Sequence, residues 1–138
     1  HVRAFHRRLS VYYEGLKASA DGGRAIDLLD YLSRHEKCLD DRLADYEEQV
    51  SANVLDTYFK YESECTQTAK IEGYTTKPHM DVCDVTAAAM YFDTCLVSFC
   101  REMAQRAHVE KIREIFESLL QLELQEQCRL SKQLLEMV

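Results

Sequence analysis

The stretch IREIFESLLQLELQEQCRLSKQLL, residues 112–135, decides the fold class of this 138-residue chain. Its apolar residues recur at steps of three and four, which is the period of an amphipathic helix. Two carboxylates, Glu123 and Glu126, stand on the same apolar face, where leucines would be expected. A carboxylate that faces a helical core is costly unless it is paired, protonated or bound to a metal. The stretch therefore predicts a long helix that carries a buried acidic site.

Three further stretches have the same period, so the sequence predicts an all-α four-helix bundle. The expected helices cover residues 1–20, 24–51, 84–107 and 109–138. Asp21-Gly22-Gly23 predicts the turn between the first two helices. A polar connection over 52–83 holds a short extra helix near 53–64, and Asp84 is the expected N-cap of the third long helix. We expect one domain over 1–138, made of a hairpin (1–51), a crossover (52–83) and a second hairpin (84–138).

The composition favours a helical protein and argues against nucleic-acid and membrane partners. One proline and four glycines suit long helices. The formal net charge of −7 argues against nucleic acid as a partner, because no basic stripe is available to meet phosphates. No unbroken apolar run approaches the roughly 20 residues of a membrane span, so we expect no membrane partner.

The six cysteines do not form a Cys-x-x-Cys pair. Zinc and disulfide frameworks need tighter spacing in loops, whereas most of these cysteines fall in predicted helices. We expect reduced thiols and a cytoplasmic protein. A disulfide between Cys65 and Cys83, which flank one loop, is the alternative.

The two predicted hairpins align with each other under a shift of 87 positions, which places Glu36 on Glu123. Glu36 lies near the centre of its own apolar stripe, with His35 at its flank. The same shift pairs His6 with Asp93, each directly after an aligned phenylalanine. All four helices thus offer a candidate metal ligand at the middle of the bundle. The expected set is His6, Glu36, Asp93, Glu123 and Glu126, with His35 as an additional ligand.

These residues resemble the ferritin-like superfamily, in particular the rubrerythrin-like di-iron carboxylate proteins. Such bundles have a long crossover between their second and third helices, and their second and fourth helices each carry Glu-x-x-His. Glu36 and Glu123 match the glutamates of that motif. The histidine position is Leu39 in one half and Glu126 in the other, which favours a one-ion or an asymmetric two-ion site.

The resemblance implies a ferritin-like protein that binds one or two ions of iron or manganese. It also implies an oxidoreductase that acts on oxygen or peroxide and takes electrons from an external donor. Carboxylate oxygens mixed with imidazole suit these metals better than a structural zinc. The alternative is a metal-free helical scaffold or interaction module, in which the carboxylates form a relic polar network. For either function we expect a homodimer.

Overall fold

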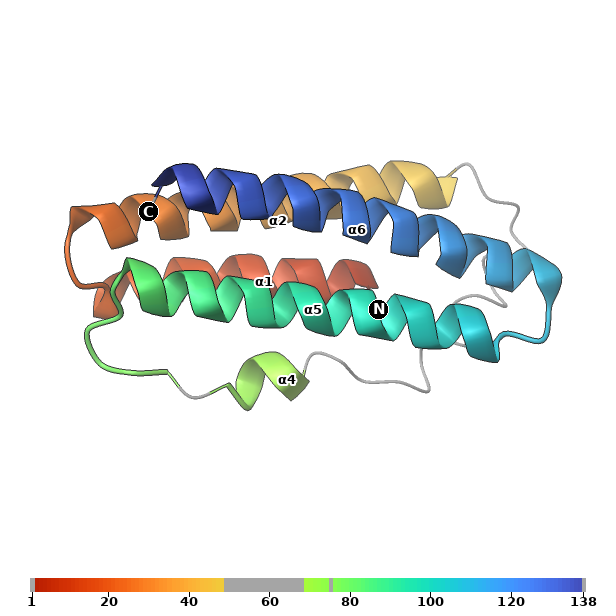
Figure 1. Cartoon of the computed structure of the whole chain (residues 1–138), viewed down its shortest axis with the longest axis horizontal. Coiled ribbons are helices and arrows are strands. Elements are labelled where there is room, and N and C mark those ends of the chain that lie inside the picture. Colours follow the sequence, from red (N-terminus) through yellow and green to blue (C-terminus); the bar gives the residue numbers. More distant parts are fainter. Residues whose placement is uncertain (1, 49–68, 75, 138) are drawn as a thin grey trace.

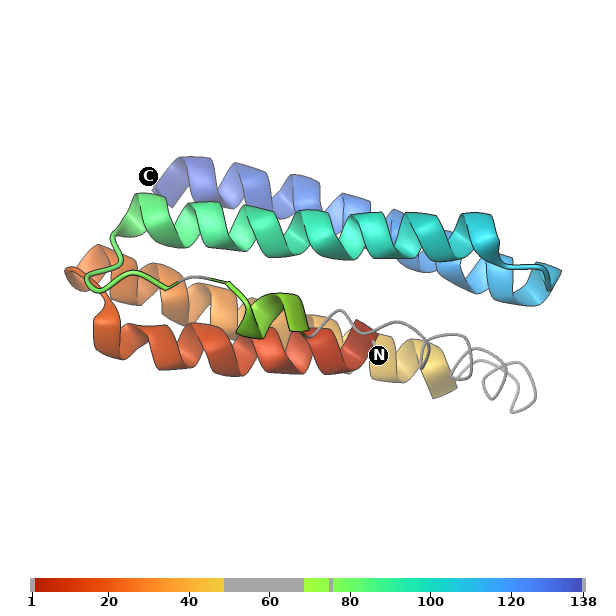
Figure 2. The same ribbon diagram turned by 90° about the horizontal axis from the view of Figure 1, so that it is seen from below.

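The described part of the chain is all-α, with four long helices packed in pairs (Figures 1 and 2). The computed structural model describes residues 2–48, 69–74 and 76–137. The long helices are α1 (Val2–Leu16), α2 (Gly23–Glu48), α5 (Val82–Arg106) and α6 (Glu110–Met137). α1 packs on α2 and α5 packs on α6, and the two hairpins lie side by side along their length. The predictions of an all-α class and of two long hairpins are confirmed.

The first helix is shorter than predicted. α1 ends at Leu16, a 3-10 turn follows over Lys17–Ser19, and Ala20 is extended. Tertiary pairing explains the difference, because Ala20 forms a parallel bridge with Met80. The amide of Met80 donates to the Ser19 carbonyl at 2.8 Å, and the amide of Asp21 donates to the Met80 carbonyl at 2.7 Å. These bonds fasten the α1–α2 turn to the segment that leads into α5.

The third long helix begins earlier than predicted, and Asp84 is not its N-cap. Asp81 is the N-cap residue, and its carboxylate accepts from the amide of Asp84 at 2.8 Å. The Asp84 carboxylate accepts in return from the amide of Asp81 at 3.2 Å. This reciprocal pair is a capping box, in which the second acid stands three residues inside the helix. The sequence prediction mistook the inner partner for the cap.

In its described residues, the connection between the hairpins contains a helix of one turn, α4 (Ala69–Glu72), which was not predicted from the sequence. Ile71 of this turn is buried at 4% exposure, and the turn lies along α1. The short helix predicted near 53–64 lies outside the described residues. Of the cysteines, Cys38, Cys83, Cys95, Cys100 and Cys128 are free thiols, so Cys83 does not form the alternative disulfide.

The predicted apolar stripes meet in one core. Each long helix contributes residues that are less than 4% exposed: Phe5, Leu9, Leu28, Leu32, Phe92, Leu96, Phe116 and Leu119. Burying side chains of this size from water is the main stabilising contribution to such a fold. α5 is the one described helix that is long and apolar enough to cross a membrane, and half of its most apolar stretch is buried in the bundle. The buried core helix of a bundle can be as long and as apolar as a membrane span, so these two properties do not distinguish them.

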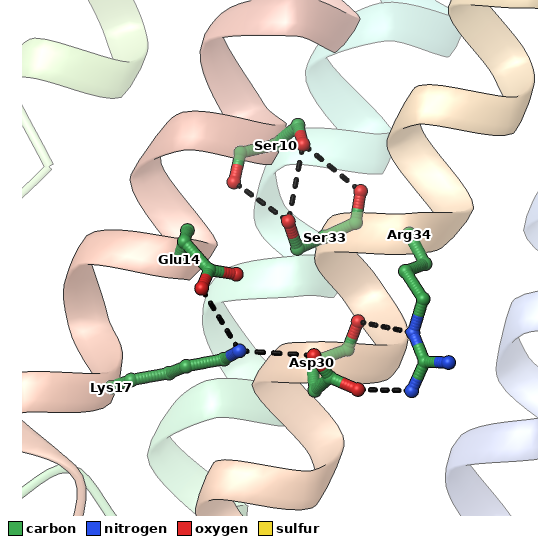
Figure 3. A network of polar contacts seen from close by, with 6 residues as sticks. All are labelled: Ser10, Glu14, Lys17, Asp30, Ser33 and Arg34. Atoms are coloured by element: carbon green, nitrogen blue, oxygen red, sulfur yellow. Dashed lines mark hydrogen bonds and ion pairs between the residues drawn. The ribbon is translucent and has the colours of Figure 1, made fainter.

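Small polar residues let α1 and α2 approach closely. Ser10 and Ser33 are both buried, and their hydroxyls lie 3.1 Å apart. Each hydroxyl also lies within hydrogen-bonding distance of the other residue's carbonyl, at 3.0 and 3.1 Å, and its single proton can go to that carbonyl or to the other hydroxyl (Figure 3). At the edge of the same interface, Lys17 joins Glu14 to Asp30. Hydrogen bonds between polar groups of the two helices therefore stabilise this interface.

Candidate functional site

The residues predicted as ligands converge inside the bundle from all four long helices. His6, Glu36, Asp93, Glu123 and Glu126 are 1%, 5%, 8%, 0% and 4% exposed. They occupy the apolar faces because each stands at a core position of its helix. Four carboxyl groups and one imidazole are thus withdrawn from water in the middle of the protein.

His6 holds two of these carboxylates together. Its Nδ1 is hydrogen-bonded to Oε2 of Glu36, and its Nε2 lies 2.8 Å from Oε1 of Glu123. A carboxylate only accepts hydrogen bonds, so both ring nitrogens must carry protons to satisfy both contacts. Burial alone would lower the pKa of His6, but the charges and hydrogen bonds of Glu123 and Glu36 raise this pKa well above its ordinary 6.5. His6 is therefore an imidazolium that bridges two buried carboxylates.

Asp93 completes the cluster as a proton carrier. Burial raises the pKa of Asp93 to about 8, and the charges of Glu123 and Glu36 act in the same direction. At neutral pH the carboxyl of Asp93 is therefore mostly protonated. Its Oδ2 is buried without a hydrogen-bond partner among the described residues, and the same is true of Oε2 of Glu123. Two oxygen atoms of the cluster are thus unsatisfied by this part of the chain.

Glu126 is neutralised by a different cation. Nη1 of Arg42 donates to Oε1 of Glu126 at 2.7 Å, and the guanidinium of Arg129 lies 3.6 Å from the same oxygen. His35 Nε2 lies 3.8 Å from Oε2 of Glu126, so His35 lies beside the cluster. Arg42 is a residue of this site that was not predicted from the sequence. The available signal was that Arg42 and Arg129 coincide under the shift of 87 positions.

Two neighbours shape the cluster without joining its ion pairs. Tyr13 is buried at 1% exposure. Burial raises the pKa of Tyr13 well above 10, and the charges of Glu36 and Asp93 raise it further. Leu39 is 3% exposed and has no atom that can bind a metal. Leu39, three residues after Glu36 on α2, therefore adds no donor atom to the site.

The negative charge of the buried carboxylate cluster is reduced by protons on His6 and Asp93. Among the described residues, no group of three or more His, Cys, Asp or Glu side chains forms a ready-made metal site. The pKa values of His6 and Asp93 are both raised, so both groups carry protons at neutral pH. A metal would bind only by displacing these protons.

No protein-family model, curated protein or solved structure matches this chain.

Proposed function

We propose that this protein is a metal-binding helical bundle of the ferritin-like kind, which takes up iron or manganese. The observation that carries the proposal is the pair of unsatisfied buried oxygens, Oδ2 of Asp93 and Oε2 of Glu123, beside His6. Buried polar atoms are nearly always bonded, so two such oxygens in one cluster call for a ligand. Carboxylate oxygens with one imidazole nitrogen are donors that suit Fe²⁺ and Mn²⁺.

The protons of the cluster would leave when the ion enters. Loss of one proton from His6 would free Nε2 as a ligand, while Nδ1–H would continue to donate to Glu36. A histidine that binds a metal commonly donates its other N–H to a carboxylate, which fixes the ring orientation. Glu36 would thus orient His6, and the ion would be held by His6, Asp93 and Glu123.

The cluster favours one ion per chain rather than two. Leu39 offers no donor at the position that would complete a second metal site. Arg42 already supplies a positive charge to Glu126, at 2.7 Å. A second metal would have to displace this guanidinium and would find fewer protein donors. The proposal is therefore a single ion on the side of the cluster formed by α1, α5 and α6.

A bound iron or manganese ion would supply one-electron redox chemistry toward oxygen or peroxide. The chain's own contribution would be to exclude bulk water and to keep the Nδ1–H of His6 hydrogen-bonded to Glu36. That bond would fix the orientation of the imidazole ligand. An external reductant would be needed, since the proposed ligand set itself supplies no electrons.

A second candidate function is a metal-free helical scaffold. Its support is that both ring nitrogens of His6 are already bonded to carboxylates, and that Glu126 is paired with Arg42. In this case the cluster would serve as a buried polar network that fixes the register of the four helices.

Metal binding to purified, metal-depleted protein separates the two functions. We expect anaerobic equilibrium dialysis against Fe²⁺ or Mn²⁺ to give about one ion per chain by elemental analysis. Glu123→Gln and Asp93→Asn should each abolish this uptake, because each removes a carboxylate ligand. Glu114→Gln, an exposed position on the same helix, is the control and should bind normally. Absence of binding to the folded wild-type protein, or equal binding by all three variants, would leave the scaffold as the function.

A further inference from the structure

A surface hollow lies between α5 and α6, near the turn that joins them. It has a volume of about 450 Å³, which is within the range of small-molecule sites. Its floor is formed by Ala104, Ala107 and Leu120, and the first two are 8% and 6% exposed. The small size of the two alanines explains why the surface is hollowed at this place.

Two arginines line this hollow from opposite helices. Arg101 belongs to α5 and Arg113 to α6, and both are exposed. All ten arginines of the chain lie within the described residues, and these two alone have no hydrogen bond or ion pair with another residue there. In a chain of net charge −7, arginines readily find carboxylate partners. The two that do not are gathered around one hollow.

We propose that this hollow binds a small monoanionic organic acid. Guanidinium groups bind carboxylates through paired, charge-assisted hydrogen bonds, so Arg101 and Arg113 would receive the carboxylate. The apolar floor would take the hydrocarbon part of the ligand. Glu117 also lines the hollow, and with the two arginines it leaves a lining charge of +1, which matches one negative charge.

This site is separate from the carboxylate cluster. Arg113 precedes Glu123 by ten residues on the same helix, which corresponds to about 15 Å along its axis. The hollow is lined by residues of α5, α6 and the turn between them, whereas the cluster draws on all four long helices. Binding in the hollow therefore does not depend on metal in the cluster.

Titration of the full chain with sodium octanoate at constant ionic strength, followed by isothermal calorimetry and by NMR of backbone amides, tests the proposal. We expect one site per chain, with shifts of amides in the α5–α6 turn. Arg101→Ala and Arg113→Ala should each weaken binding roughly tenfold, because each removes a charge-assisted hydrogen bond. Glu117→Gln should strengthen binding, because it removes the one negative charge of the lining.

The matched control is Arg106→Ala. Arg106 lies near the same turn but is paired with Glu102 at 3.2 Å, so its loss should leave octanoate binding unchanged. The proposal is overturned if wild-type protein does not bind octanoate, or if Arg106→Ala weakens binding as much as the other two variants do. It is also overturned if inorganic phosphate binds and octanoate does not, since the apolar floor would then have no part. Circular dichroism of each variant verifies that the fold is retained.

Discussion

The two hairpins of this protein differ in how fully their polar groups are satisfied. In the α1–α2 hairpin, the buried hydroxyls of Ser10 and Ser33 bond to each other and to backbone carbonyls. The same hairpin supplies the cations of the core, His6 on α1 and Arg42 on α2. Each of these cations already holds a carboxylate.

The α5–α6 hairpin contains the unsatisfied groups. Within the described residues, three buried side-chain oxygens have no hydrogen-bond partner, and they belong to Thr86, Asp93 and Glu123. Arg101 and Arg113, the two arginines without a partner in the described part of the chain, are on the same hairpin. Among the described residues, the buried polar side chains of the α1–α2 hairpin are therefore bonded, partly to carboxylates of α6, whereas the α5–α6 hairpin retains donors and acceptors that a ligand can meet. The groups without a partner are concentrated in one half of the fold.

The largest expected effect is a loss of folding stability as pH rises, caused by the buried Asp93 and His6. Asp93 has a pKa of about 8 in the folded protein and an ordinary value of 3.8 when unfolded, so the folded state binds more protons between these values. Stability should therefore fall as pH rises from 4 to 8, by on the order of 5 kcal/mol, because one additional bound proton contributes about 1.4 kcal/mol for each pH unit of this interval. His6 acts in the same direction, because its stabilising contribution is complete below pH 6.5 and is lost as pH rises toward its raised pKa.

Urea unfolding of the metal-free protein at a series of pH values measures this slope. Asp93→Asn is the matched variant, since it keeps the shape of the side chain and cannot ionise. We expect its stability to be much less dependent on pH than that of the wild type. A wild-type stability that rises between pH 5 and pH 8 would contradict the protonation state assigned to Asp93.

The next largest effect should follow from removing the cation that joins the hairpins. His6→Ala leaves Glu36 and Glu123 buried without a counter-charge, and breaking such a pair costs about 3–5 kcal/mol. Unfolding in urea at pH 7 measures the loss, with the exposed His108→Ala as a control that should change little. Adding Glu36→Gln and Glu123→Gln to His6→Ala should recover part of the stability. If the single variant loses less than about 1 kcal/mol, His6 is not a buried cation.

Much of this site was predicted from helical periodicity. Projection on a helix placed Glu36, Glu123 and Glu126 on the apolar faces of their helices and placed His6 and Asp93 at the flanks of theirs, and all five are buried. The prediction succeeded because position on an amphipathic helix determines burial almost without regard to tertiary detail.

Contacts between distant segments could not be predicted in this way. Arg42 was missed because its side chain is half exposed, and its long stem carries the guanidinium inward to Glu126. The early end of α1 depends on Met80, which lies about sixty residues away in the sequence. The unsatisfied oxygens of Asp93 and Glu123 were equally hidden, because only coordinates show which of two carboxylate atoms lacks a partner.

A smaller effect is expected from filling the unsatisfied positions with metal. If Mn²⁺ binds the folded state alone, a concentration about a hundredfold above the dissociation constant adds roughly 2.7 kcal/mol of stability. The gain should be larger at pH 8 than at pH 6, because protons on Asp93 and His6 compete with the ion. Thermal unfolding with and without Mn²⁺, at pH 6 and at pH 8, measures this gain in stability. Equal gains at the two pH values would show that the ion binds elsewhere, and Asp93→Asn should remove the gain entirely.

The smallest expected change in stability comes from removing the buried serine hydroxyls of the α1–α2 hairpin. Ser10→Ala should cost about 1 kcal/mol, because it removes a hydroxyl that bonds to both the carbonyl and the hydroxyl of Ser33. Ser33→Ala should cost a similar amount. The double variant should lose less than the sum, since the bond between the two hydroxyls is removed by either change alone. Urea unfolding of the three variants measures this coupling between the two serines.

The double variant also tests whether the serines affect the metal site. Because neither serine bonds to a residue of the carboxylate cluster, metal uptake by the double variant should equal that of the wild type. A loss of uptake would mean that the serine pair also positions His6, which is one of the proposed ligands.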